Sequence, residues 1–251
     1  MIELKQVSKR FGDLIVLDGV DFAVNKGETV ALLGPSGVGK SVLLKHINGL
    51  IHPDRGEVWV DGLNVNRLPR KQLARLRTRI GYVFQGGALF DSMSVAENIR
   101  LGITDEERAS DPSYSVERVR QCLDLVNLEP GVGEKYPAEL SGGMKKRVGI
   151  ARAIAGEPVY LLWDEPTSGL DPVNADIIDS LVEKLDNELG VTSVVVTHDV
   201  RGAFRVSGRI ALLMDGRIRA MGKPAELRAS TDPAVQQFLE RDLTVPVSHL
   251  G

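Results

Sequence analysis

Short apolar runs separated by glycine-containing turns dominate the first third of the chain. Their length and turn-forming flanks, such as Phe11-Gly12-Asp13, are typical of strands, and the first two predict a small antiparallel layer. The third run leads directly into a glycine-rich stretch, after which residues 40–49 repeat apolar side chains at helical spacing. The predicted strands of this region are residues 3–7, 20–24, 30–33, 57–60 and 80–84.

Helical spacing takes over from residue 94 to residue 155, with breaks at residues 104–115 and 129–133. Apolar strands then resume on either side of a predicted helix at residues 173–189. This alternation favours a mostly parallel sheet with helices on both faces. The later strands are predicted at residues 159–163, 193–197 and 210–214.

The combined pattern predicts an α/β fold with a mostly parallel sheet core, an N-terminal antiparallel β layer and an inserted helical subdomain. We expect residues 1–242 to form one domain, residues 94–155 to be the insertion and residues 243–251 to be a tail.

The composition of the chain argues against several classes of protein. A formal net charge of -3 over 251 residues gives no bulk reason to bind nucleic acid. We see no signal peptide and no apolar run near the ~20 residues that span a bilayer, so we expect a cytosolic chain. The single cysteine, Cys122, excludes an intrachain disulfide, and its helical apolar neighbours predict a buried, inert thiol.

The glycine-rich stretch matches the phosphate-binding pattern G-x-x-x-x-G-K-[ST] in the strand-to-helix context that the pattern requires. Its glycines let backbone N–H groups turn toward phosphates, and the following helix adds its positive N-terminal end. Lys40 would reach the β- and γ-phosphates, while Ser41 would offer a hydroxyl to Mg²⁺. The eight residues are Gly34, Pro35, Ser36, Gly37, Val38, Gly39, Lys40 and Ser41.

Two acids follow the strand predicted at residues 159–163. Asp164 has the oxygen chemistry that Mg²⁺ prefers, and Glu165 is placed to polarise an attacking water. The alternative is that both acids cap a helix or form salt bridges.

The segment Leu140-Ser141-Gly142-Gly143-Met144 lies between these two motifs and resembles the signature of ATP-binding cassette (ABC) ATPases. The resemblance implies an ABC-type P-loop domain that binds ATP and Mg²⁺ and hydrolyses ATP. It also implies a homodimer, in which Ser141, Gly142 and Gly143 of one subunit cover the nucleotide held by the other. A guanine-reading N-K-x-D motif is missing from the sequence, which favours ATP over GTP.

The same resemblance assigns roles to further residues. Glu165 matches the catalytic base, His198 the switch histidine, and Gln85 a catalytic glutamine that contacts the metal. Asp171 ends the D-loop, which crosses the dimer interface, and Phe11 matches the aromatic that stacks on adenine. The alternatives are a structural histidine at a strand end and a core phenylalanine.

A finer resemblance points to the ATPases of Mce-type lipid transporters, including the Mla phospholipid system. It rests on the segment from Phe84 to Val95, on Met144 in place of a common glutamine, and on the C-terminal Asp232 to Leu239. It implies membrane permease partners, with an Mce lipid-binding protein and a STAS-domain protein, at the cytoplasmic side of the inner membrane. Trp163 departs from the usual aliphatic residue.

Three classes of function remain distinct. A transport motor subunit is favoured, for lipids or for another solute. A soluble ABC enzyme would usually carry tandem cassettes or basic arms, and a binding module without turnover is disfavoured by Glu165 and His198. The last residues of the chain, around Val245-Pro246-Val247, are predicted to pack on a neighbouring ATPase subunit, with packing on the chain's own surface as the alternative.

Overall fold

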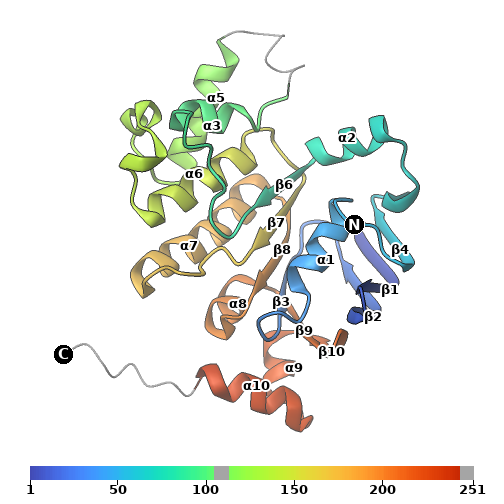
Figure 1. Cartoon of the computed structure of the whole chain (residues 1–251). Coiled ribbons are helices and arrows are strands. Elements are labelled where there is room, and N and C mark those ends of the chain that lie inside the picture. The colour runs from blue at the N-terminus through green and yellow to red at the C-terminus, as the bar shows by residue number, and fades with distance from the viewer. Residues whose placement is uncertain (105–112, 244–251) are drawn as a thin grey trace, which may run out of the picture. The chain divides into compact units, whose positions relative to one another are not determined.

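The computed structural model describes residues 1–104 and 113–243, which divide into two compact units. Unit 1 comprises residues 1–66 and 195–251, and unit 2 comprises residues 67–194. Figure 1 labels the helices and strands. The predicted break at residues 104–115 and the predicted tail lie largely outside the described residues. Within the described ranges, no helix is both long and apolar enough to cross a membrane.

The first sheet of unit 1 is the predicted antiparallel layer. Its strand order is β2-β1-β4-β5, and the first two strands are longer than predicted because their pairing continues to the hairpin, where Phe11 faces Leu14. A bulge between Leu4 and Val7 leaves Gln6 in the left-handed region, at φ 51°. The strands are β1 (Ile2–Phe11), β2 (Leu14–Val24), β4 (Arg55–Val60) and β5 (Leu63–Asn64).

The second group of strands in unit 1 supports the glycine-rich loop. Strand β3 (Thr29–Leu33) pairs in parallel with β9 (Arg209–Met214), which pairs antiparallel with β10 (Arg217–Gly222). Residues 30–33 are fully buried, as expected for a strand covered on both faces. The helices of unit 1 are α1 (Lys40–Ile47), α8 (Val200–Val206), α9 (Pro224–Arg228) and α10 (Pro233–Leu243).

Helix α10 packs on the chain's own core. Val235 and Leu239 are buried against Val200, Ala203 and Leu227 of α8 and α9. The apolar face of this helix is therefore buried against unit 1 itself. The predicted contact of the final residues with a neighbouring subunit falls outside the described residues.

Unit 2 combines two parallel strands with helices. Strand β6 pairs with β7, and β6 ends at Val83, one residue before the predicted end. Strand β8 (Thr192–Thr197) contains the boundary between the units. The strands and helices are β6 (Ile80–Val83), β7 (Tyr160–Asp164), α2 (Arg70–Thr78), α3 (Val95–Arg100), α5 (Tyr114–Leu125), α6 (Gly142–Ile154) and α7 (Pro172–Leu189); the 3₁₀ turns are Pro130–Glu134 and Pro137–Glu139, and Val65–Arg67 precedes α2.

Helices α3, α5 and α6 pack on one another (Figure 1). Ser94 begins α3 with a capping box to Glu97, and the fully buried Asn98 bonds backbone atoms of Phe90 and Met93, which orders the loop after β6. Cys122 of α5 is buried, as predicted, and burial raises the pKa of its thiol to about 11.

Candidate functional site

The glycine-rich loop of unit 1 has the backbone shape that only glycine permits at two positions. A Cβ at Gly34 would lie 2.3 Å from the carbonyl oxygen of Leu213. At Gly39, φ is 108° and a Cβ would lie 2.7 Å from Val16. Between them Pro35, Ser36 and Gly37 are exposed, so the loop presents its backbone to a ligand.

Lys40 lies at the first turn of α1 and points back at the loop. Its ammonium donates to the carbonyl oxygens of Gly34, at 2.8 Å, and Pro35, at 3.0 Å. The side chain is only 4% exposed, so most of its length is buried and the charged end lies at the loop. Ser41 follows on the same turn and is half-buried.

Two further predicted residues belong to unit 1. His198 is exposed and follows β8 directly, before Asp199, which caps α8 by accepting from the N–H of Gly202 at 3.1 Å. Phe11 ends β1 and is 48% exposed, with the Lys9 ammonium 5.5 Å from its ring centroid. Phe11 is therefore a surface aromatic and not part of the core.

Asp164 ends β7 in unit 2 and is 8% exposed. The hydroxyl of Tyr82, on the neighbouring strand β6, donates to its Oδ2 at 2.9 Å. Burial, followed by the charge of Asp164, raises the pKa of Tyr82, so the phenol remains a donor. The carboxylate is thereby fixed in direction at the end of the strand.

Glu165 has a strained backbone. Its φ is 50°, in the left-handed region, and its carbonyl oxygen accepts from the N–H of Ser168 at 3.2 Å. Gln85, which follows β6, donates from Nε2 to the Ser168 hydroxyl at 3.1 Å. The structure thus joins Gln85 to the segment that follows Glu165.

The signature segment begins helix α6. Ser141 is its N-cap and accepts from the N–H of Met144 at 3.3 Å, so Gly142 and Gly143 form the first turn. A Cβ at Gly143 would lie 2.6 Å from Oδ1 of Asn174. Asn174 in turn donates to Asp171, the N-cap of α7, and this hydrogen bond lowers the pKa of Asp171. The signature and the predicted D-loop therefore lie side by side.

The predicted residues thus fall into two groups, each placed within its own unit. Unit 1 holds the glycine-rich loop, Phe11 and His198, and unit 2 holds Gln85, Asp164, Glu165, Asp171 and residues 141–143. Sequence reasoning missed Tyr82, Asn174 and Lys146 in unit 2, the last of which bonds the segment after Glu165. For Tyr82 and Lys146 the available signal was a polar group within an apolar strand or on a buried helix face, and for Asn174 it was its place three residues after the N-cap Asp171.

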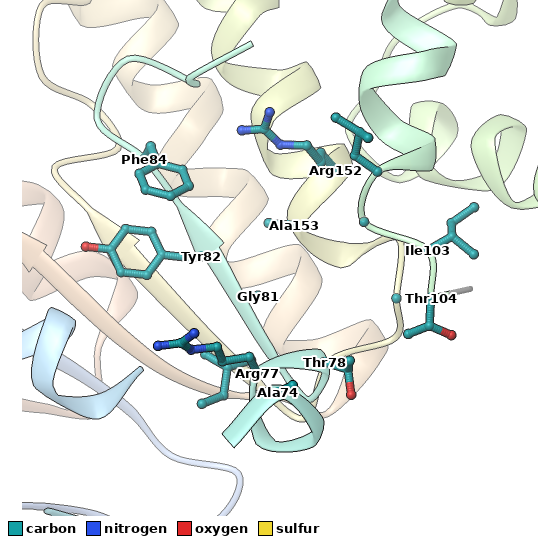
Figure 2. A pocket seen from close by; sticks show the side chains of 14 residues that line it. Ala74, Arg77, Thr78, Gly81, Tyr82, Phe84, Ile103, Thr104, Arg152 and Ala153 are labelled. Atoms are coloured by element: carbon teal, nitrogen blue, oxygen red, sulfur yellow. The ribbon is translucent and has the colours of Figure 1, made fainter. Parts of the chain in front are cut away.

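A groove of about 500 Å³ lies beside β6 in unit 2. Figure 2 shows Arg152 and Arg77 at opposite ends of its labelled residues, with Gly81 and Tyr82 between them. Among the described residues its lining contains no acid: it comprises Ala74, Arg77, Thr78, Ile80, Gly81, Tyr82, Phe84, Leu101, Gly102, Ile103, Thr104, Arg152, Ala153 and Gly156.

The glycine-rich loop between a buried parallel strand and a helix, together with an acid pair after another buried strand, defines a P-loop nucleoside triphosphatase. A profile described as ABC transporter matches residues 17–168. The chain belongs to the ABC transporter family and is an ATP-binding subunit of the ABC ATPase type.

Relatives and solved structures agree with this assignment. The chain is 37% identical over 247 residues to the intermembrane phospholipid transport system ATP-binding protein MlaF of Escherichia coli strain K12, covering 98% of this chain and 91% of that protein. It is 41% identical to the sulfate/thiosulfate import ATP-binding protein CysA of Gloeobacter violaceus, covering 98% of this chain and 70% of that protein. A dimeric post-hydrolysis structure of the ATP-binding cassette MJ0796 bound to ADP and Pi matches with a TM-score of 0.78 at 37% identity. The match covers 89% of this chain and 99% of that chain. The predicted fold class and ATPase class are confirmed.

Proposed function

We propose that the chain is the ATP-hydrolysing motor of a transporter that moves phospholipids or related lipids in the cell envelope with an Mce-type system. The observation that carries the proposal is the 37% identity, over 98% of the chain, to a phospholipid transport ATP-binding protein. The segment from Phe84 to Val95 and Met144 support it by their resemblance to Mce-associated ATPases. Import of another solute is the second candidate, because a sulfate/thiosulfate import subunit is 41% identical.

Each ATP is held by the glycine-rich loop of one chain and covered by the signature of a second chain. Lys40 exchanges the carbonyl oxygens of Gly34 and Pro35 for phosphate oxygens, which compete well for a buried ammonium. Ser141 and the first turn of α6 supply N–H groups and a positive helix end to the γ-phosphate of the partner's ATP. Closure therefore requires the γ-phosphate.

Glu165 acts as the base that orients and activates the attacking water, and His198 donates to the γ-phosphate. Gln85 reaches the same water from the loop after β6, and Phe11 offers a ring face to adenine. The exposure of Phe11 and of His198 leaves both accessible to a ligand. Cleavage removes the shared γ-phosphate and lets the two chains separate.

The proposed magnesium ligands are the Ser41 hydroxyl, the Asp164 carboxylate and the Gln85 amide oxygen. All three are oxygen donors, which suits a hard cation, and Tyr82 fixes the direction of the Asp164 carboxylate. No three acid, histidine or cysteine side chains gather into a metal cage anywhere in residues 1–104 and 113–243. Phosphate and water oxygens would complete the coordination of the ion, which would neutralise phosphate charge when bound.

The partners follow from the same proposal. The groove beside β6 would receive a cytoplasmic segment of a membrane permease, because it joins the loop of Gln85 to helix α6 and offers an apolar floor with two arginines. The chain would then lie peripherally at the cytoplasmic side of the inner membrane, with an Mce lipid-binding protein and a STAS-domain protein in the same complex.

The test is Glu165→Gln in the complex with its permease, reconstituted in vesicles. The substitution keeps the shape of the side chain and removes its basicity, so ATP binding should persist while turnover falls by about 10² to 10³-fold. Light scattering should show an ATP-bound dimer, and ATP-dependent transfer of a labelled phospholipid should be lost.

Unchanged hydrolysis by this variant would refute the assignment of Glu165. If the unsubstituted complex hydrolyses ATP but moves labelled sulfate or another small solute and no phospholipid, the solute importer replaces the lipid proposal.

A further inference from the structure

Lys146 connects the signature helix to the segment that follows Glu165. It lies in the second turn of α6 and is 8% exposed. Its ammonium donates to the carbonyl oxygen of Pro166, at 2.8 Å, and to that of Ser168. Both acceptors lie within three residues of Glu165 in the sequence, and all these residues belong to unit 2.

The segment held by Lys146 carries backbone strain. Glu165 has a φ of 50°, a conformation that costs a β-carbon-bearing residue free energy and persists only where its surroundings fix it. Three contacts meet at Ser168: its N–H donates to Glu165, its hydroxyl accepts from Gln85, and its carbonyl oxygen accepts from Lys146. Lys146 is therefore part of what fixes the backbone of Glu165.

The charges of Lys146 and Glu165 also connect these two residues. Burial lowers the pKa of the Lys146 ammonium, and the negative charge of Glu165 acts in the opposite direction. An ammonium with so little exposure needs both its carbonyl acceptors and a nearby anion. A neutral side chain of similar length would leave two buried carbonyl oxygens without this donor.

We infer that Lys146 is a positioning residue that holds Glu165 in its catalytic conformation and links it to the signature of the same chain. Ser141 and Lys146 belong to the same helix, α6. When the signature of this chain binds the partner's ATP, the helix would therefore also act on the loop that positions Glu165. That glutamate acts on the ATP held by its own chain. The inference rests on the proposed function, in which Glu165 is the base.

The experiment compares Lys146→Met, Lys146→Arg and the control Lys145→Met in steady-state hydrolysis of ATP by the complex. Lys146→Met should lower kcat by about tenfold or more and leave KM within about twofold, because it displaces the base and spares the glycine-rich loop. Lys146→Arg keeps a cation with several donors and should retain at least about a third of kcat. Lys145→Met removes the adjacent ammonium of the same helix and should remain within about twofold of the unsubstituted protein.

A second measurement separates positioning from general damage to the fold. Lys146→Met combined with Glu165→Gln should still form the ATP-dependent dimer, because ATP binding does not depend on the placement of residue 165. If Lys146→Met fails to fold, Lys146→Gln, which keeps one donor group, replaces it in both measurements. We expect the same loss of kcat in the single variant and the same ATP-dependent dimer in the double variant.

Equal kcat values for Lys146→Met and Lys145→Met would overturn the inference, as would a rise in KM at unchanged kcat. Loss of the ATP-dependent dimer in the folded double variant would overturn it as well. Full turnover by Glu165→Gln alone would instead refute the proposed function, so the two failures are distinguishable.

Discussion

His46 places a polar ring in a buried position on α1, the helix that begins with Lys40. It is 1% exposed, and its Nδ1 lies 2.7 Å from the carbonyl oxygen of Val42. Because a carbonyl only accepts, Nδ1 carries the proton of the neutral ring and donates it. Nε2 is buried and has no hydrogen-bond partner within the described part of the chain. Protonation of the ring would therefore bury an unpaired N–H together with a charge.

This environment makes the stability of unit 1 sensitive to acid. Burial lowers the pKa of His46; Lys9 and His52 lower it further, while the Val42 carbonyl and Asp54 oppose the shift. The unfolded chain therefore binds a proton at a higher pH than the folded chain does. The stabilisation is complete above about pH 6.5 and is lost progressively as the pH falls below that value.

We predict that the urea concentration at the unfolding midpoint is lower at pH 5.5 than at pH 7.5. His46→Leu should make this difference smaller. At neutral pH the variant should gain about 1 kcal/mol in free energy of unfolding, because no unpaired acceptor remains buried. Urea titrations of both proteins at the two pH values measure this. Parallel falls in the two proteins would contradict the account of His46.

At the scale of elements, helix α6 packs directly on the loop that carries Gln85. A Cβ at Gly149 would lie 2.8 Å from Cα of Gly87, and Arg152 of the same helix donates to the carbonyl oxygens of Gly87 and Ala88, both at 2.7 Å. The close approach needs a residue without a side chain on α6.

We predict that Gly149→Ala costs about 1 to 3 kcal/mol in free energy of unfolding, since backbone and not a flexible side chain stands in the way. Gly86→Ala is the matched control, because nothing lies within 4 Å of its Cβ position. Chemical denaturation measures the free energy of unfolding of both variants. Equal values for the two would contradict the close packing of α6 on the loop that carries Gln85.

The sequence predicted most elements where apolar periodicity was strong. It gave no prediction for α2 (Arg70–Thr78), in which only Leu76 is buried, because so short a basic helix has no apolar stripe to detect. Strands β1 and β2 were predicted too short: pairing to the hairpin carries β1 through the polar residues 8–10, and it starts β2 at Leu14, in an apolar run that the prediction left out. The motif residues of the candidate site were proposed from the sequence, whereas Tyr82 and Lys146 were found only through contacts between segments distant in the chain.

At the scale of the whole molecule, the proposed mechanism places two chains at every functional ATP site. The glycine-rich loop and the signature are placed in different units of one chain, and we propose that they act on different nucleotides. A head-to-tail pair closed by two shared ATP molecules has two equivalent sites. In the proposed pair, each site would take Lys40 from one subunit and Ser141 from the other.

Mixing two inactive variants tests this central claim most directly. Lys40→Ala destroys the phosphate grip of its own chain, and Ser141→Arg blocks the cover that its chain gives to the partner, so neither homodimer should hydrolyse ATP at more than about a hundredth of the normal rate. In the mixed dimer one site carries both defects and the other carries neither. An equal mixture should therefore recover about a quarter of normal turnover, given random pairing. A mixture as inactive as its two components would contradict a shared nucleotide site.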